Sequence, residues 1–335
     1  RKSDKFACMN ESYFWMGGRL ATDLIAITHD PKDLDSGFWA ITTTFDGNFT
    51  AAKFGKVINE DWNFPYQPLR ISSWESSHAK ESYCELVEEF RRQIADGNVY
   101  QVNACRILSN QTTEKIEGLV AGFLAKNPAR YAGYLSIPGL EIASASPETF
   151  LKRDGNLLVS SPIKGTRKPG LTGRFPEKDE SENIMIVDLM RNDLGKVCIE
   201  DSITVPKLLG IQELPGLAHL VSDVQGTVRL GVTWKEIFDA TLPPGSVSGA
   251  PKSSAIKLIK KFEKIDRGPY CGAFGWIDGE SAELAVAIRT FWSDGKVVKF
   301  GTGAGITWNS SAEEEWHETE LKAARLIAIA NGELK

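Results

Sequence analysis

Two stretches of the sequence place acidic side chains at the spacing of one helix face. Asp179 and Glu182 stand three residues apart beside a hydrophobic seam, and Glu315 and Glu318 repeat that spacing near the C-terminus. Side chains three or four positions apart lie on the same side of a helix. The pattern fits two solvated helix faces, in which Lys322 would pair with Glu318. It also fits two carboxylate pairs around Mg²⁺, which takes its remaining ligands from water and an anionic substrate.

A lysine stands at the end of a predicted strand. Residues 162–166 read PIKGT, so Lys164 follows an apolar residue and precedes a Gly-Thr pair. It is either an ordinary strand-end lysine with its ammonium group in water, or an amine held in a pocket. An amine shielded from water loses its proton more easily and can act as a nucleophile. The local sequence is compatible with both interpretations.

Two further basic side chains stand among apolar residues. His219 lies in the segment AHLVSD, where a lone histidine is more often structural than catalytic. Arg289 lies in the strand-like segment AVAIRTF, and a buried guanidinium needs a partner because an unpaired buried charge is costly. A substrate carboxylate would suit its two-pronged donor geometry. An internal Asp or Glu would serve equally well.

Two segments rich in small residues are candidates for close contact with a ligand. Residues 301–305 read GTGAG, but the spacing is not that of the dinucleotide fingerprint, and no βαβ unit follows. Residues 243–252 read PPGSVSGAPK just before a predicted helix, whose first N–H groups could hold an anion. A plain Pro-Gly turn explains the second segment as well.

The composition excludes several classes of function. The chain has 335 residues, of which 42% are hydrophobic and 25% charged, as in an ordinary soluble globular protein. A net charge of −5 offers no electrostatic surface for nucleic acid. No apolar run reaches the roughly 18 residues of a membrane helix. Five scattered cysteines without a CxxC pair, and no visible signal peptide, predict reduced thiols in the cytoplasm.

The elements that must position these side chains are grouped rather than strictly alternating. Short runs of Phe, Trp, Ile and Thr with glycine turns predict strands over residues 12–58, and a proline-containing connection follows over 59–78. The grouping favours an α+β fold with mainly antiparallel strands. Periodicity, turn and capping signals predict a hairpin over 148–163 and helices over 83–94, 116–123, 181–194, 250–263 and 312–330, with one more helix capped by Thr233 and Glu236.

Several motifs, taken together and in this order, resemble the chorismate-utilising enzymes, which include anthranilate, aminodeoxychorismate, isochorismate and salicylate synthases. The resemblance covers about residues 78–330. The motifs are SASPE (144–148), PIKGTR (162–167), ENIMIVDLMRNDLG (182–195), AHLVSDVQG (218–226), PPGSVSGAPK (243–252), PYCGAFGW (269–276), AIRT (287–290), GTGAGI (301–306) and EEEWHETELKA (313–323).

The resemblance implies a fold and a reaction. It implies an anthranilate-synthase-like αββα sandwich of two antiparallel sheets flanked by helices, and a Mg²⁺-dependent reaction on chorismate. We expect residues 78–335 to form this chorismate-binding catalytic domain. Residues 1–77 would form an N-terminal strand-rich region that packs on it.

The resemblance also assigns roles to the acidic residues. Glu182 and Glu318 match the metal-ligating glutamates of the family. Asp179 and Glu315 match their companion carboxylates, one shell further out. The first companion is usually a glutamate, so Asp179 is a small departure from the family pattern.

The remaining site residues follow in the same way, as implied by the resemblance. Arg289 would grip the enolpyruvyl carboxylate of chorismate, with Tyr270 beside it. His219 and Glu148 would lie near the C4 hydroxyl, and Glu148 would protonate that hydroxyl if burial raises its pKa. The other residues expected to contact the substrate are Gly165, Thr166, Ser246, Gly303, Ala304, Gly305 and Lys322.

Lys164 selects one reaction within the family. Anthranilate synthases usually have alanine at this position, whereas PIKGT is the form found in aminodeoxychorismate synthase component I. There the lysine would add to ring C2 as the C4 hydroxyl departs, and ammonia would then attack C4 and expel the lysine. The product would be 4-amino-4-deoxychorismate, the precursor of 4-aminobenzoate in folate biosynthesis. The alternative is anthranilate synthase component I, which would release pyruvate.

The reaction needs ammonia, and the cysteines of the sequence bear on where it comes from. None of the five cysteines lies in a nucleophile-elbow motif typical of a glutaminase. Ammonia is therefore expected to come from a partner glutamine amidotransferase subunit, or from free ammonia at high concentration. The opposite possibility, a non-catalytic subunit that only docks an amidotransferase, is disfavoured by the set of carboxylates together with Arg289 and Lys164.

Overall fold

The computed structural model describes residues 12–71, 73–167, 170, 173–214 and 217–333. The strands are joined by antiparallel pairings into one hydrogen-bonded network. The strands are β1 (Tyr13–Met16), β2 (Arg19–Thr28), β3 (Phe38–Thr43), β4 (Phe49–Asn59), β5 (Glu75–Ser76), β6 (Gln101–Gln111), β7 (Tyr131–Ile137), β8 (Leu140–Ser146), β9 (Thr149–Asp154), β10 (Leu157–Ser161), β11 (Ile163–Arg167), β12 (Thr204–Leu214), β13 (Leu217–Thr227), β14 (Gly249–Ala250), β15 (Ala273–Asp278), β16 (Ser281–Val286), β17 (Thr290–Ser293) and β18 (Val297–Ile306).

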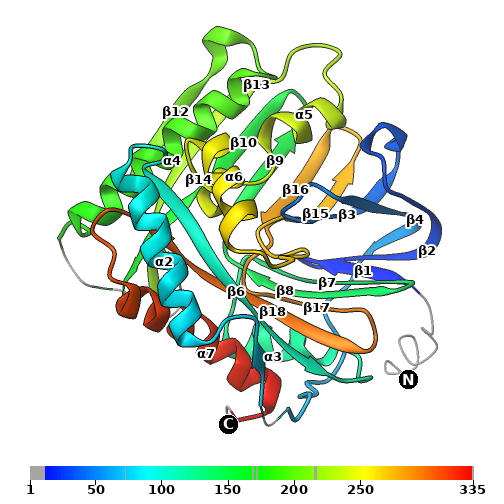
Figure 1. Ribbon diagram of the computed structural model, residues 1–335. Coiled ribbons are helices and arrows are strands. Elements are labelled where there is room, and N and C mark those ends of the chain that lie inside the picture. Colours follow the sequence, from blue (N-terminus) through cyan, green and yellow to red (C-terminus); the bar gives the residue numbers. More distant parts are fainter. Residues whose placement is uncertain (1–11, 72, 168–169, 171–172, 215–216, 334–335) are drawn as a thin grey trace.

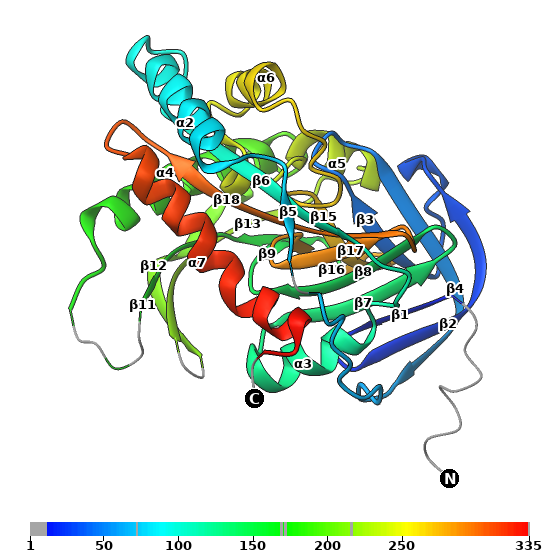
Figure 2. The ribbon, with the colours of Figure 1, turned by 60° about the horizontal axis from the view of Figure 1, so that its bottom comes forward.

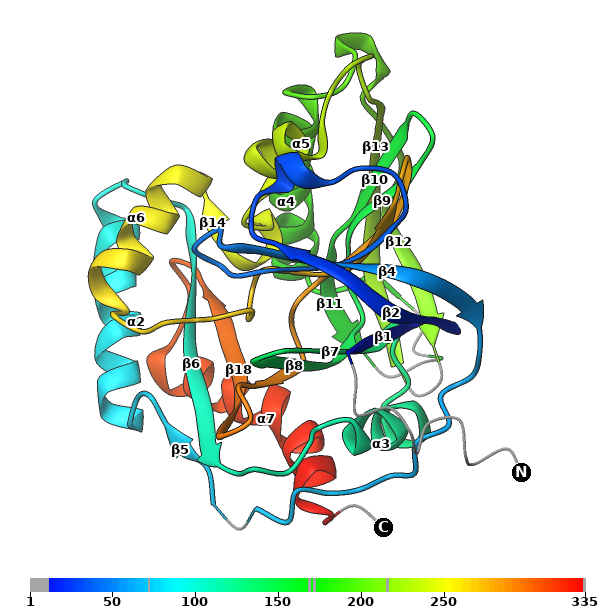
Figure 3. The same ribbon diagram turned by 90° about the vertical axis from the view of Figure 1, so that its right-hand side faces the viewer.

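The pairings give a continuous order of strands. It runs β12, β13, β10, β9, β16, β15, β3, β4, β2, β1, β7, β8, β17, β18 and β6. β11 continues along β13 beside β10, and β5 and β14 pair with β6. The expected α+β fold with antiparallel strands is confirmed. The strands do not divide into two separately hydrogen-bonded sheets, however, because the ladder is unbroken from β12 to β6 and curls (Figure 3).

The N-terminal strands belong to this same ladder. β1 pairs with β7 and β3 pairs with β15, both of which lie within the predicted catalytic domain. Phe14 and Trp39 from these strands are buried in the main hydrophobic core. A boundary near residue 77 would therefore cut through a shared sheet and a shared core, and the division into two regions stays a prediction.

Helices cover the two ends of the ladder. α4 packs on β13, whereas α7 packs on β18 and α2, and α6 packs near β6 (Figures 1 and 2). Among the described residues, no helix has the length and apolar character needed to cross a membrane. The α-helices are α2 (Lys80–Ala95), α3 (Gly118–Lys126), α4 (Glu177–Gly195), α5 (Trp234–Thr241), α6 (Lys252–Phe262) and α7 (Ala312–Asn331), and the short 3₁₀ helices are η1 (Pro31–Asp33), η2 (Glu200–Ser202) and η3 (Gly245–Val247).

The helices and turns predicted from periodicity are confirmed within a few residues. α2, α3, α4, α6 and α7 cover the predicted helical segments, and β9 and β10 form the predicted hairpin. Thr233 and Glu236 form the capping box at the start of α5. α4 and α7 matter most for function, because they carry the two acidic pairs.

Candidate active site

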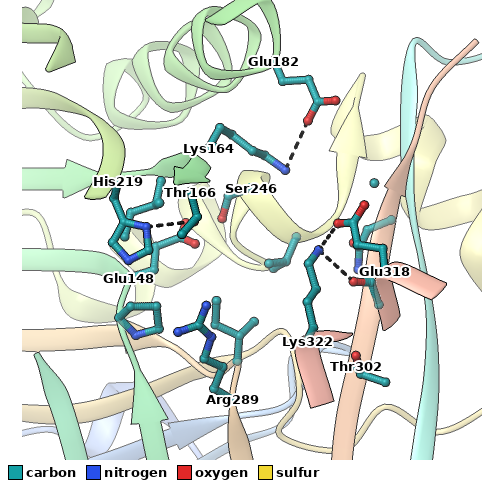
Figure 4. A pocket seen from close by; sticks show the side chains of 18 of the residues that line it. Glu148, Lys164, Thr166, Glu182, His219, Ser246, Arg289, Thr302, Glu318 and Lys322 are labelled. Atoms are coloured by element: carbon teal, nitrogen blue, oxygen red, sulfur yellow. Dashed lines mark hydrogen bonds and ion pairs between the residues drawn. The ribbon is translucent and has the colours of Figure 1, made fainter. Parts of the chain in front are cut away.

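Most of the predicted site residues meet in one cavity of about 400 Å³. Its walls come from α4 and β11 on one side and from α7 and β18 on the other, so the curl of the sheet brings distant strands together (Figure 4). The predicted residues that line it are Glu148, Lys164, Gly165, Thr166, Asp179, Glu182, His219, Ser246, Tyr270, Arg289, Gly303, Gly305, Glu318 and Lys322.

Two predicted residues do not line the cavity. Ala304 is fully buried between Gly303 and Gly305, because successive side chains of a strand point to opposite faces. Glu315 is 3% exposed and lies behind the cavity wall, where it accepts a hydrogen bond from the Ser310 hydroxyl at 2.6 Å. Any contact of Ala304 with a substrate would therefore be through its backbone, and the roles of Ala304 and Glu315 stay predictions.

Asp179 and Glu182 of α4 and Glu318 of α7 face the same cavity. Burial raises the pKa of Asp179, and the nearby negative charge of Glu182 raises it further. Burial acts against ionisation of Glu318 as well, but the Lys322 ammonium at 2.5 Å outweighs it and lowers the pKa of Glu318. Lys322 also donates to the backbone carbonyl of Gly303 at 3.1 Å. Carboxylates and ammonium groups thus lie close together in this cavity, so positive charge is concentrated there although the protein is acidic overall.

The carboxylates of Glu182 and Glu318, called below the acidic wall of the cavity, are of the kind that binds Mg²⁺. Glu182 and Glu318 offer carboxylate oxygens from two facing helices, and Oε2 of Glu315 behind them is buried without a hydrogen-bond partner among the described residues. The carboxylates are also paired with ammonium groups, at 3.7 Å for Glu182 and Lys164. Within the described part of the chain, no three His, Cys, Asp or Glu side chains form a ready-made metal cluster. A metal would therefore take part of its ligands from substrate or water.

Lys164 points into the cavity rather than into bulk water. It lies on β11, and its side chain is 18% exposed. The following residue, Gly165, has a φ of +81°, and a Cβ there would come within 2.8 Å of the Phe175 ring and 3.0 Å of Asp179. Only glycine combines this backbone conformation with this close approach to α4. Gly165 therefore lets β11 pass close to α4 directly after Lys164.

Glu148 is a buried carboxyl group with an altered acidity. Burial raises its pKa to about 7, although hydrogen bonds from the Ser246 hydroxyl and the Ile163 backbone, and the charges of Lys164 and Arg289, act in the opposite direction. A carboxyl group with a pKa near neutrality can give up a proton during a reaction. Glu148 is thus suited to serve as a general acid.

His219 is held in one orientation beside Glu148 (Figure 4). Its Nδ1 lies 2.9 Å from the Thr166 hydroxyl, while Nε2 is buried without a partner among the described residues. Burial lowers the pKa of His219 to about 4, and the charge of Arg289 adds to this effect. The imidazole is therefore neutral at pH 7, and Nε2 is the nitrogen available to a substrate.

For Arg289, the sequence was compatible with two partners, a substrate carboxylate or an internal Asp or Glu. Burial lowers the pKa of Arg289, while the negative charge of Glu148 acts in the opposite direction. Within the described residues, however, no carboxylate lies within ion-pair distance of its guanidinium, so an internal Asp or Glu does not neutralise it. A partly buried guanidinium that opens into a cavity is suited to bind a substrate carboxylate.

Several lining residues were not identified from the sequence. Asn103 and Thr302 come from the paired strands β6 and β18, and Lys178 precedes Asp179 on α4. The signal for Lys178 was its spacing of four residues from Glu182, which places both on one helix face. Asn103 carried no comparable signal, because β6 contains several other polar residues.

The fold and cavity together define a class of protein. A cavity that combines a guanidinium, ammonium groups, a carboxyl group of near-neutral pKa and carboxylates from two helices is typical of an enzyme active site. Comparison with known proteins identifies its family. The model of the chorismate binding enzyme family matches residues 49–328, and the chain belongs to this family.

Relatives within the family carry different names. The chain is 35% identical over 269 residues to anthranilate synthase component 1 of Saccharolobus solfataricus, covering 77% of this chain and 64% of the relative. It is 38% identical over 266 residues to aminodeoxychorismate synthase of Streptomyces pristinaespiralis, covering 75% of this chain and 37% of the relative. The chain thus spans less than two thirds of the length of these relatives.

The fold agrees with the family. The structure of MenF, the menaquinone-specific isochorismate synthase from Escherichia coli, matches with a TM-score of 0.79 at 17% identity, covering 96% of this chain and 89% of that one. At this identity the match shows the fold alone. The names of the relatives and of this neighbour differ in the reaction, so the choice among reactions depends on individual residues.

Proposed function

We propose that this chain is an aminodeoxychorismate synthase component I, which converts chorismate and ammonia to 4-amino-4-deoxychorismate. The observation that carries the proposal is Lys164, whose amine lies inside the cavity with Glu148, His219 and Arg289. A strand-end lysine of the ordinary kind would have its ammonium group in water. Lysine at this position is the feature that the resemblance associates with amination at C4.

The charges of the cavity suit the two carboxylates of chorismate. Arg289 has no internal carboxylate partner among the described residues and would bind one carboxylate through paired N–H donors. Glu182 and Glu318, with Asp179 close by, would hold Mg²⁺ at the other carboxylate. When bound, Mg²⁺ would neutralise charge on the substrate. The ring would then lie between Arg289 and the acidic wall, next to Lys164.

The chemistry proceeds in two substitutions. The lone pair of the Lys164 nitrogen forms a bond to ring C2, the two ring double bonds shift, and the C4–O bond breaks. Glu148 gives its proton to the departing hydroxyl, which leaves as water. Ammonia then forms a bond to C4, the double bonds shift back, and the bond between Lys164 and C2 breaks. Lys164 leaves C2 as the same amine that attacked, and the new ammonium group at C4 gives one proton to the Glu148 carboxylate, which restores the acid.

A partner subunit would supply the ammonia. We propose a glutamine amidotransferase, because no glutaminase motif is present around the cysteines of this chain. The four cysteines that the structure describes are free thiols, which supports a reaction in the cytoplasm. The relative from Saccharolobus solfataricus favours a second candidate, anthranilate synthase component I, since that relative is an anthranilate synthase component 1.

One assay separates the two candidates. The chain is incubated with chorismate, MgCl₂ and an ammonium salt. The products are then separated, and their masses are measured by mass spectrometry. The proposal predicts a product in which an amine replaces one hydroxyl, with no pyruvate. Anthranilate together with an equal amount of pyruvate would overturn the proposal in favour of anthranilate synthase.

A further inference from the structure

Gln101 is a buried polar residue beside the cavity. It begins β6, its side chain is 3% exposed, and it follows the exposed Tyr100. The backbone is paired on both sides here, because Gln101 faces Ala250 in β14 and the next residue, Val102, faces Ile306 in β18. Two neighbouring strands therefore fix its position.

The alternation of β6 directs Gln101 toward the acidic wall. Asn103, two residues further on, lines the cavity, whereas Val102 between them is buried in the core. Nε2 of Gln101 lies 3.4 Å from Oε2 of Glu182. Gly305 leaves room for this amide, since a Cβ on Gly305 would come within 2.4 Å of Nε2.

The same oxygen of Glu182 has a second neighbour. Nζ of Lys164 lies 3.7 Å from Oε2, the atom that also faces the Gln101 amide. The carboxylate is thus held between an ammonium group and a neutral N–H donor. An amide can hold a carboxylate in this way without adding charge to the site.

The carbonyl oxygen of the Gln101 amide indicates why a glutamine stands at this position. Oε1 is buried without a hydrogen-bond partner among the described residues. A buried carbonyl oxygen without a donor is unfavourable, and the opposite amide orientation would place that oxygen against the Glu182 carboxylate. Methionine has a similar length and would fill this space with no unpaired polar atom. A polar residue at a position where an apolar one would be more stable indicates a role in the site.

We propose that Gln101 is a positioning residue, whose amide N–H orients the Glu182 carboxylate for Mg²⁺ binding. This inference rests on the proposed function, because it takes Glu182 as a metal ligand. Removing a residue that orients a metal ligand commonly weakens metal binding or activity by roughly 10–100-fold. Gln101 itself contacts neither substrate nor metal in this role.

The test compares the wild-type chain with Gln101→Met, and Gln93→Met serves as the matched control. Gln93 makes the same type of contact, from Nε2 to Oε1 of Glu89 at 2.9 Å, within α2 and outside the cavity lining. Two quantities are measured for each protein. The first is the rise in melting temperature produced by MgCl₂ without substrate, since a ligand of the folded state stabilises it. The second is the Mg²⁺ concentration for half-maximal turnover of chorismate with ammonium.

We expect Gln101→Met to melt at or above the wild-type temperature without Mg²⁺. It should need roughly tenfold more Mg²⁺, or more, for the same thermal shift and for half-maximal turnover. Gln93→Met should leave both Mg²⁺ responses unchanged.

A wild-type response to Mg²⁺ in Gln101→Met would overturn the positioning role and leave the proposed function standing. Melting of Gln101→Met far below the wild type would also overturn it, because the amide would then be structural. No response to Mg²⁺ in the wild type itself would overturn the metal assignment of Glu182, and the positioning role with it.

Discussion

The ammonium nitrogen of Lys164 lies 3.7 Å from the carboxylate of Glu182, and it would lie 3.9 Å from a Cβ placed on Gly305. The lysine therefore extends from β11 toward both α4 and β18. These elements are close only because the sheet curls. The side chain occupies the interior of the cavity, where its amine can meet a bound ring.

The first prediction concerns the chemistry of Lys164. Lys164→Ala and Lys164→Arg should both lose turnover with ammonium by on the order of a thousandfold or more, because neither side chain can attack a ring carbon. Arginine would keep the positive charge beside Glu182. Near-wild-type turnover of Lys164→Arg would identify the residue as an electrostatic anchor only.

A trapping experiment gives an independent check on the same residue. Incubation with chorismate and MgCl₂ in the absence of ammonia should leave a ring adduct on the peptide that contains Lys164. Lys152, which pairs with Glu283 at 3.5 Å and is 45% exposed, serves as the control lysine. Labelling of both lysines alike, or of neither, would contradict covalent catalysis by Lys164.

The second prediction concerns Glu148 as the acid. Its pKa of about 7 means that the protonated form is lost as pH rises through neutrality, so the rate of C4 hydroxyl loss should fall above pH 7. Glu148→Gln should lower turnover by roughly 10²–10⁴-fold and remove this alkaline limb from the pH profile. An unchanged alkaline limb in the variant would assign the titration to another group.

The same carboxyl group predicts a pH dependence of stability. Burial raises the pKa of Glu148 from its usual 4.5 to about 7, so the folded protein binds this proton more tightly than the unfolded chain. Its contribution to stability is fully present below pH 4.5 and is lost as pH rises through about 7. The difference corresponds to about 3 kcal/mol of unfolding free energy. Denaturant unfolding should therefore show Glu148→Gln gaining stability relative to the wild type above pH 7, with no gain near pH 4.

The third prediction concerns the metal. Glu182→Ala and Glu318→Ala should each abolish Mg²⁺-dependent turnover while leaving the circular dichroism spectrum unchanged, because both carboxylates lie at the cavity surface. Glu180→Ala on α4 and Glu314→Ala on α7 are matched controls outside the cavity lining, and should retain activity. Mg²⁺-dependent turnover in both cavity variants would exclude the metal assignment.

The fourth prediction concerns Arg289. Arg289→Lys keeps the charge but loses the paired N–H geometry, so the KM for chorismate should rise by roughly 10–100-fold, with a smaller change in kcat. Steady-state kinetics with saturating Mg²⁺ and ammonium measure both constants. A loss confined to kcat would place Arg289 at the reacting atoms rather than at a substrate carboxylate.

The fifth prediction concerns the nitrogen source. The purified chain should turn over chorismate with ammonium but not with glutamine, and addition of a matching amidotransferase subunit should restore the use of glutamine. Glutamate release is the direct measurement. Glutamine hydrolysis by the pure chain would show that it contains a glutaminase activity.

The helices, the capping box and the glycine turns were determined by local sequence. The helices α4 and α7, the capping box of Thr233 and Glu236, and the glycine turns follow from periodicity and backbone preference, and the structure has them where they were predicted. The same-face spacing of the two acidic pairs is a property of each helix alone. The family motifs added which side chains belong to one site.

Only the tertiary structure decided how these side chains meet. Arg289 has no carboxylate at ion-pair distance in the part of the chain that the structure describes. Glu148 is buried enough for its pKa to reach about 7, and Ala304 faces the core between two cavity-lining glycines. The contact of Gln101 with Glu182 joins residues 81 positions apart. Sequence periodicity records the face on which a side chain lies, but not which distant face it will meet. That partner is set by the curl of the ladder, which brings β11 and β18 to one cavity, and by the burial that follows from it.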